Sequence, residues 1–258
     1  MLKEKQLIVS LTSFPAAISY AVQAIQSVID GSVLPDKIVL YLTASQFPNR
    51  EIPQELQDLI DKNPIFEIRF YEENIRSYTK LIPALQDFPN DIIVTIDDDI
   101  LYGKNMLQRL FQIHKKYPDA IIGHRVRHFK PNAPYRKWER YKGFRYILKN
   151  LQPKFSNVQT GVGGVLYPPH SLKKEMLDSK IFMEIAPTVD DMWFWLAAVA
   201  NGTKIAPVPF GYCKPKGLDK PEEISLKQIN INKIDVNRMV VEKIFEKYPN
   251  IKQRVEKD

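Results

Sequence analysis

The sequence predicts a single α/β domain with a mixed, mostly parallel sheet flanked by helices. Short apolar, β-branched runs alternate with segments of helical periodicity, as in proteins built from βαβ units. Neither an internal repeat nor a separating linker interrupts this alternation. The length of 258 residues, with 44% hydrophobic and 26% charged residues, also suits one globular domain, so we expect residues 1–258 to fold as a unit.

The first half of the chain carries the clearest alternation. Residues 7–11 form an apolar run that predicts a buried strand, residues 16–29 show helical spacing, and residues 37–42 predict a second strand. Such a βαβ unit implies parallel strands joined by a right-handed crossover. Further elements are expected as a helix at 53–60, a strand at 66–71, a weak helix at 80–85 and a strand at 91–96.

The second half is less regular. A helix is expected at 106–114, a strand at 120–123, a glycine-flanked strand at 161–167, a helix from Asp191 onward and a final basic helix at 236–248. Residues 125–154 are rich in Arg and Lys interleaved with aromatic residues, and Glu139 is their single acid. Because this basic stretch has poor periodicity, it predicts an insertion or a long loop.

Charge and cysteine content narrow the class of protein. The 37 Lys and Arg against 30 Asp and Glu leave a net charge of +7, which suits phosphate-bearing partners or an anionic membrane surface. Cys213 stands alone, which excludes an internal disulfide and a thiolate zinc cluster. No signal peptide and no apolar run of the roughly 18–20 residues that span a bilayer are recognisable. We therefore expect a cytoplasmic protein, with peripheral contact at the inner membrane face.

The strongest chemical signal is the run Asp97-Asp98-Asp99, which directly follows the most apolar predicted strand. Ligands of parallel α/β sheets bind beyond the carboxyl ends of strands, so these carboxylates are in the right place. A divalent cation would relieve their mutual repulsion, and oxygen-only ligation suits Mn²⁺ or Mg²⁺. The alternative is an acidic turn whose aspartates cap the next helix.

Residues 93–99 resemble the DxD motif of nucleotide-sugar glycosyltransferases with the GT-A fold. Three other segments, 9–13, 76–80 and 187–193, resemble further segments of these enzymes in the same order, and the likeness spans roughly residues 7–210. It is greatest to bacterial enzymes of surface-polysaccharide synthesis. One departure is the end of the second strand, Leu42-Thr43-Ala44-Ser45, which lacks the acidic residue often found there and leaves the nucleotide undecided.

The resemblance implies that the first strand and its loop hold the nucleobase and ribose, and that a metal bound by Asp97 and Asp99 neutralises the leaving diphosphate. A second positive charge is expected from Arg76 or Lys80, although Arg76 fits a solvated helix face equally well. The candidate substrate-binding residues are Ser10, Thr12, Arg76, Lys80, Asp98, Gly163, Gly164, Asp190 and Trp193. The glycines would let the backbone approach a sugar, or form a plain bulge. Trp193 would stack on the sugar face.

The pair Asp190-Asp191 precedes an apolar helix and resembles the segment that supplies the general base of inverting enzymes. A helix N-terminus keeps a carboxylate ionised, as a base requires. Thr188 and Asp191 also have the spacing of a capping box, which is the structural alternative. We predict that Asp191 is the base and that Asp190 binds the acceptor hydroxyl.

The predicted function is metal-dependent transfer, with inversion, of a sugar from a nucleotide donor, expected to be a UDP-sugar, to a glycan or lipid-linked glycan. Residues 1–100 would bind the nucleotide and residues 101–258 the acceptor. One alternative is a nucleic-acid-binding protein that uses the basic stretch, but no nucleic-acid-binding motif is present, so no nucleic-acid partner is expected. The other is a metal-dependent phosphoester hydrolase with the same aspartates.

Overall fold

The computed structural model describes residues 5–141, 151–209, 216–219 and 235–258. In this part of the chain the main sheet has eight strands, in the order β3-β2-β1-β4-β8-β6-β7, with β9 beside β6. Its strands are β1 (Leu7–Ser13), β2 (Lys37–Thr43), β3 (Phe66–Tyr71), β4 (Ile92–Thr95), β6 (Ile121–His128), β7 (Glu139–Arg140), β8 (Asn157–Tyr167) and β9 (Ile205–Pro207). A separate ladder joins β5 (Ile100–Leu101) to β10 (Lys216–Gly217).

The sheet is mixed and mostly parallel, as the sequence predicts. The pairs β1–β2, β2–β3, β1–β4 and β6–β9 are parallel. The long strand β8 runs antiparallel to both of its neighbours, β4 and β6. Because β8 is the common neighbour, it joins the parallel first half of the chain to the second half.

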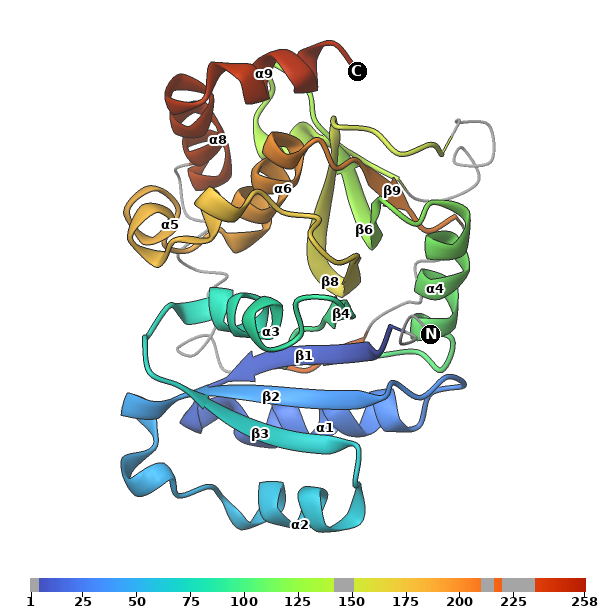
Figure 1. The fold of residues 1–258 in the computed structure, drawn as a ribbon, viewed down its shortest axis with the longest axis vertical. Helices are drawn as coiled ribbons and strands as arrows, with labels where there is room; N and C mark the ends of the chain where they lie inside the picture. The colour runs from blue at the N-terminus through green and yellow to red at the C-terminus, as the bar shows by residue number, and fades with distance from the viewer. Residues whose placement is uncertain (1–4, 142–150, 210–215, 220–234) are drawn as a thin grey trace.

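Two helical layers cover the sheet (Figure 1). The helices are α1 (Ile18–Ile29), α2 (Gln54–Lys62), α3 (Ile82–Asp87), α4 (Met106–Lys116), α5 (Ser179–Ile185), α6 (Asp190–Asn201), α8 (Val236–Lys247) and α9 (Pro249–Glu256). Helices α1, α2 and α4 contribute to the apolar core on one face, whereas α3, α5, α6, α8 and α9 contribute to the core on the other. Helix α6 is apolar around most of its circumference, as expected for a helix enclosed by the core that it shares with α3, α5, α8 and α9.

The structure corrects the predicted elements mainly in the second half. Strand β6 continues to His128, so Arg125 and Arg127 lie in a strand rather than in the predicted loop. Backbone pairing with β8 stabilises this strand although its own sequence is highly charged. The sequence did not predict α5 or α9, and β8 begins earlier than expected, at Asn157. Residues 142–150 of the basic stretch, and Cys213, lie outside the described residues.

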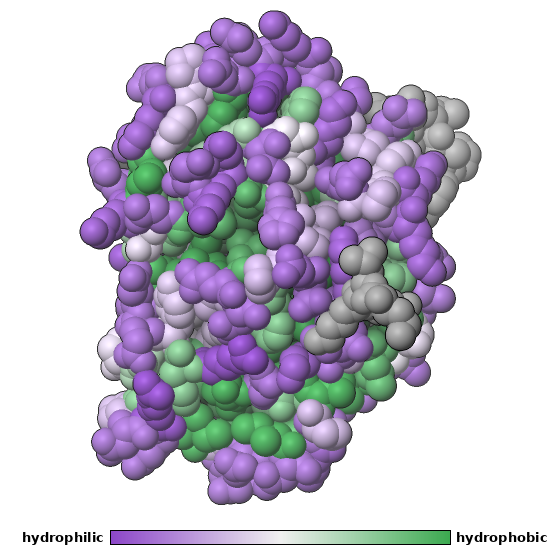
Figure 2. Space-filling view, in the orientation of Figure 1, coloured by the Kyte–Doolittle hydropathy of each residue, from purple (hydrophilic) through white to green (hydrophobic). Residues whose placement is uncertain are grey.

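Hydrophilic residues cover most of the face shown in Figure 2, with apolar residues visible between them. Among the described residues, the large hydrophobic side chains that are well exposed are Leu34 and Met239. None of the helices in this part of the chain has both the length and the apolar composition that crossing a membrane requires.

Gly163 and Gly164 have a packing role, which differs from the predicted approach to a sugar. Both have positive φ, +100° and +91°, which side-chain-bearing residues rarely adopt. A Cβ at Gly163 would lie 3.0 Å from the Cβ of His124, and one at Gly164 would lie 3.1 Å from Met106 Sδ. These glycines therefore form the irregular part of β8 where it passes β6 and α4.

We predict that Gly163→Ala lowers the free energy of unfolding by roughly 1–3 kcal/mol, because it adds backbone strain and a close contact with His124. Gly217→Ala is the control, since a Cβ there meets nothing within 4 Å. Denaturant unfolding of both variants measures the difference. Equal stabilities would contradict the packing role.

Candidate active site

A buried lysine organises the site at the carboxyl end of β4. Lys80 Nζ lies 3.0 Å from Asp97 Oδ1 and 3.0 Å from Asp190 Oδ2, and its side chain is only 10% exposed. Asp97 follows β4, Asp190 begins α6, and Lys80 ends a short 3₁₀ helix over Arg76–Lys80. One ammonium group therefore joins three segments that are far apart in the sequence.

The 3₁₀ helix is held so that Lys80 must face inward. The Tyr78 hydroxyl donates to the carbonyl of Ala186 at 2.7 Å, and its ring stacks on Phe182 with centroids 4.1 Å apart. On the other side, Ser10 Oγ donates to the Lys80 carbonyl at 2.6 Å. These contacts attach the segment to α5 and β1, so that the lysine side chain reaches the carboxylates.

The electrostatic balance keeps Lys80 charged. Burial alone would lower its pKa, because water solvates an ammonium better than the protein interior does. The charge of Asp190, followed by the charges of Asp97 and Asp191, outweighs burial and raises the pKa of Lys80 well above its usual range. The lysine is thus a permanent counterion for a group of carboxylates.

Asp191 faces the same group from the first turn of α6. Its Oδ1 accepts a hydrogen bond from the Gly161 N–H of β8 at 3.0 Å, and the side chain keeps partial exposure to solvent. Burial is the main reason that the pKa of Asp191 rises to about 7, and the negative charge of Asp190 adds to this rise. Lys80 and the Gly161 N–H act in the opposite direction.

The contacts of Asp191 favour a role other than the capping-box alternative. The N-cap of α6 is Val189, without a side-chain capping hydrogen bond, and the carboxylate of Asp191 binds β8 instead of its own helix. The expectation that the helix N-terminus keeps Asp191 ionised also needs correction, because burial and the charge of Asp190 raise its pKa.

Gly161 is the glycine that opens this site. A Cβ at this position would lie 2.9 Å from Asp97 Oδ1 and 3.2 Å from Lys80 Nζ. Any side chain would therefore intrude between β8 and the ion pair. The sequence places Gly161 beside two other glycines, and only the packing distinguishes the one that faces the carboxylates.

Hydrogen bonds hold the run Asp97-Asp98-Asp99 against neighbouring segments. Asp98 Oδ2 accepts from Ser13 Oγ at 2.6 Å, which fixes the loop after β4 to the end of β1. The Asp97 N–H donates to the Tyr102 hydroxyl at 2.7 Å. Ser13 and Tyr102 were not predicted, because their roles depend on contacts between strand ends.

Four of the predicted substrate-binding residues do not join the cluster of the Lys80 ammonium group and the carboxylates through their side chains. Trp193 is fully buried and its Nε1 donates to the Met176 carbonyl at 2.7 Å, so it is a core residue and cannot stack on a sugar. Ser10 is fully buried and bonds Lys80. Thr12 is partly exposed, with Oγ1 donating to the Tyr41 carbonyl at 2.8 Å. Arg76 is exposed, with φ of 56°, on the same 3₁₀ helix as Lys80.

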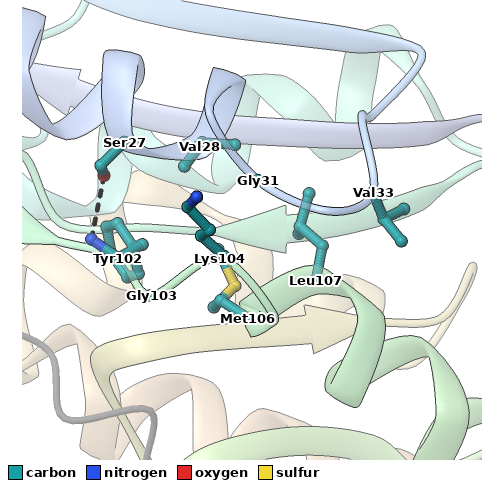
Figure 3. A pocket seen from close by; sticks show the side chains of 9 residues that line it. All are labelled: Ser27, Val28, Gly31, Val33, Tyr102, Gly103, Lys104, Met106 and Leu107. Carbon is teal, nitrogen blue, oxygen red and sulfur yellow. Dashed lines mark hydrogen bonds between the residues drawn. The ribbon is translucent and has the colours of Figure 1, made fainter.

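The two described cavities are separate from the carboxylates. A pocket of about 10 Å³, the space of a single water, lies between α1 and residues 102–107 and is lined partly by Tyr102 (Figure 3). A larger cavity of about 140 Å³ lies between residues 129–138 and helices α8 and α9. Neither one has Lys80, Asp97 or Asp191 in its lining.

The predicted metal site can be tested against the available donor atoms. Among the described residues, no group of three or more His, Cys, Asp or Glu side chains is placed to enclose a cation. A divalent ion in a nucleotide site, however, needs only one or two carboxylates, because phosphate and water oxygens complete its coordination. Asp97 and Asp99 both follow β4, and Asp97 is already paired with Lys80 through its Oδ1.

The sheet order and the polar cluster at the end of β4 describe an α/β domain with its candidate site beyond the strand ends, and the family comparison gives its class. A model of glycosyl transferase family 2 matches residues 16–178, which is more than half of the chain. The chain therefore belongs to glycosyl transferase family 2. A search of curated proteins finds no match.

A solved structure with a similar fold is the mannosyltransferase PcManGT from Pyrobaculum calidifontis, in complex with GDP-Man and Mn²⁺. The TM-score is 0.55 with 12% sequence identity, over 96% of this chain and 72% of that one. At this identity the likeness concerns the fold, which matches the GT-A fold expected from the sequence.

We predict that Lys80→Met lowers the free energy of unfolding by about 3–5 kcal/mol, because it leaves the buried carboxylates without their counterion. The control is Lys37→Met, which removes a lysine paired with Glu67 at a site where both side chains are about one-third exposed. That loss should stay below about 1 kcal/mol. Urea unfolding at pH 8 compares the two, and similar losses would contradict the counterion role.

Proposed function

We propose that this protein transfers a sugar from a nucleotide-sugar donor to a hydroxyl group of a glycan or lipid-linked glycan, with inversion at the sugar carbon. The observation that carries this proposal is the position of Asp191. It is a partly exposed carboxylate with a pKa of about 7, beside the ion pair of Lys80 and the Asp97 that follows β4. A base that ionises near neutral pH is suited to accept a proton from an attacking hydroxyl.

The residues divide into two groups. Asp97 and Asp99 would hold Mn²⁺ or Mg²⁺, which supplies charge neutralisation for a leaving diphosphate when bound. Lys80 orients Asp97 and Asp190 through its ion pairs, rather than contacting the phosphates directly as the sequence predicts. Asp191 accepts the proton of the acceptor hydroxyl at its carboxylate, held in place by the Gly161 N–H.

The donor nucleotide and the cellular setting belong to the same proposal. From the sequence we expect a UDP-sugar, whereas the structural neighbour was solved with GDP-Man, so both nucleotides are used in the tests. A role in surface-polysaccharide synthesis at the inner membrane face is part of this proposal, and the net charge of +7 suits contact with an anionic membrane surface. Residues 1–100 would contribute most donor contacts and residues 101–258 most acceptor contacts.

We predict that Asp97→Asn and Asp99→Asn each remove the Mn²⁺-dependent part of the affinity for GDP or UDP, because each deletes a charged oxygen ligand with little change in size. Calorimetric titrations with and without Mn²⁺ measure this part. Asp61→Asn, on the exposed surface of α2, is the matched control for loss of one charge. Metal-dependent binding that survives both site substitutions would refute the ligand assignment.

We predict that Asp191→Asn slows transfer by a factor on the order of 10² to 10⁴ while nucleotide affinity stays nearly unchanged. In the wild type, the rate at saturating donor should rise with pH and level off above about 7, because only the ionised carboxylate accepts a proton. Asp190→Asn, measured in parallel, tests the neighbouring carboxylate. An active Asp191→Asn enzyme would exclude this residue as the base.

The stability of the Asp191→Asn variant gives an independent check. The pKa of Asp191 is raised from an ordinary 3.8 to about 7 on folding, so the folded protein binds this proton more tightly than the unfolded chain. The contribution of Asp191 to wild-type stability therefore falls as pH rises from about 4 to 7. We predict that the variant melts above the wild type at pH 8 and that this advantage disappears near pH 4. A lower melting temperature at pH 8 would indicate that Asp191 stabilises the fold as a simple cap.

A further inference from the structure

Three arginines gather on strands β6 and β7, on the side of β8 away from β4. Arg125 and Arg127 lie two residues apart on β6, and Arg140 of β7 is the direct cross-strand partner of Arg127. Like charges directly opposite one another destabilise a sheet. Repulsion by Arg140 and Arg125 adds to burial in lowering the pKa of Arg127, which shows that the three charges act on one another.

None of these arginines has a carboxylate partner within salt-bridge distance among the described residues. Glu139, the acid of this segment, instead pairs with Lys130 at 3.9 Å. The Nε atoms of Arg125 and Arg127 are both buried without a hydrogen-bond partner, and Arg127 is only 5% exposed. Unpaired guanidinium donors in a buried setting are costly, so a bound anion would relieve both the repulsion and the unmet hydrogen bonds.

Arg127 is held rigidly in this position. Its Nη1 donates to the Trp138 carbonyl at 3.1 Å and to the Tyr135 carbonyl at 3.4 Å, and its guanidinium carbon lies 4.4 Å from the centroid of the Tyr135 ring. Arg125 is half-buried, so its guanidinium retains access to solvent. The arginine group therefore combines the buried, hydrogen-bonded guanidinium of Arg127 with the solvent-accessible guanidinium of Arg125.

Tyr135 connects this group to the proposed base. Burial is the main reason that the pKa of Tyr135 is raised. The charges of Arg127 and Arg125 lower this pKa, whereas the charge of Asp191 raises it, so the phenol is within electrostatic reach of the arginines and of Asp191. The strand order supports the same placement. Asp97 follows β4 and Asp191 binds Gly161 of β8, whereas the arginines lie on β6 and β7 beyond β8. Asp191 is thus between the nucleotide side and the arginines.

We propose that Arg125, Arg127 and Arg140 form an anion subsite for the acceptor, which would therefore carry a carboxylate or a phosphate near its reacting hydroxyl. This inference rests on the proposed function and adds a substrate class to it. Arginine forks match the geometry of both anions. A uronic acid unit and a phosphate-bearing acceptor are the two sources of such a group.

The test compares ligands that differ in charge. Methyl glucuronide and methyl glucoside differ mainly in the carboxylate, and glucose 6-phosphate supplies the phosphate arm. We expect NMR titration of the whole protein to show at least tenfold tighter binding of one anionic sugar than of methyl glucoside, because a hydrogen bond to a charged group changes the affinity by about this factor. The tighter anion identifies the source. Equal binding of all three sugars would overturn the proposal.

Arginine variants test whether these side chains cause the preference for an anionic sugar over methyl glucoside. Arg125→Gln and Arg140→Gln should each reduce it severalfold, and Arg125→Lys should retain part of it. Arg50→Gln is the matched control, because Arg50 is exposed and pairs with Glu72 near β3 at the opposite edge of the sheet. Circular dichroism and melting temperatures verify folding. A preference that survives both Gln substitutions would refute the assignment.

Two further titrations distinguish an acceptor subsite from a donor site and from a nucleic-acid site. If Arg125→Gln weakens Mn²⁺-dependent GDP or UDP binding as much as it weakens anionic-sugar binding, the arginines serve the donor and the acceptor proposal fails. Tight, length-dependent binding of single-stranded RNA that Arg125→Gln abolishes would also overturn it. A wild-type protein that binds neither nucleotide with Mn²⁺ counts against the proposed function alone, and the sugar titrations then decide the subsite separately.

Discussion

The ion pairs of Lys80 are the interaction on which the site depends. Carboxylates from the end of β4 and the start of α6 converge in a mostly buried place, where their mutual repulsion would be large without a cation. Lys80 supplies that cation from a third segment, and the stacked, hydrogen-bonded Tyr78 holds the segment in place. The geometry of the site thus follows from a charge balance that the fold must satisfy.

The same charge balance differentiates the two aspartates of α6. Asp190 is paired directly with Lys80, whereas Asp191 is one residue further and binds a backbone N–H of β8. Burial and the negative charge of Asp190 raise the pKa of Asp191 to about 7, so this carboxylate exchanges its proton near neutral pH. The proposed acid–base role of Asp191 is consistent with this division, whereas the carboxylate of Asp190 is taken up by its ion pair with Lys80.

Strand β8 lies between the carboxylates that follow β4 and the arginines of β6 and β7. It pairs with β4 through Val165–Tyr167, and it pairs with β6 both at Val165–Leu166 and through Asn157–Thr160, so Gly161 lies at the interruption of its pairing with β6. Its irregular backbone at Gly163 and Gly164 packs on His124 and Met106. The strand therefore brings the carboxylates and the arginine group to opposite sides of one short segment, which accounts for the position of Asp191 between them.

The sequence by itself determined the fold class, most strands and helices of the first half, and the location of the aspartates, because these follow from local apolar periodicity and from motif spacing. Tertiary structure decided the rest. Whether Lys80 meets phosphate or carboxylates, which glycine faces the site and whether Trp193 is core or surface all depend on contacts between segments distant in the chain. The strand character of Arg125 and Arg127 likewise comes from pairing with β8, an interaction that charge and local propensity do not encode.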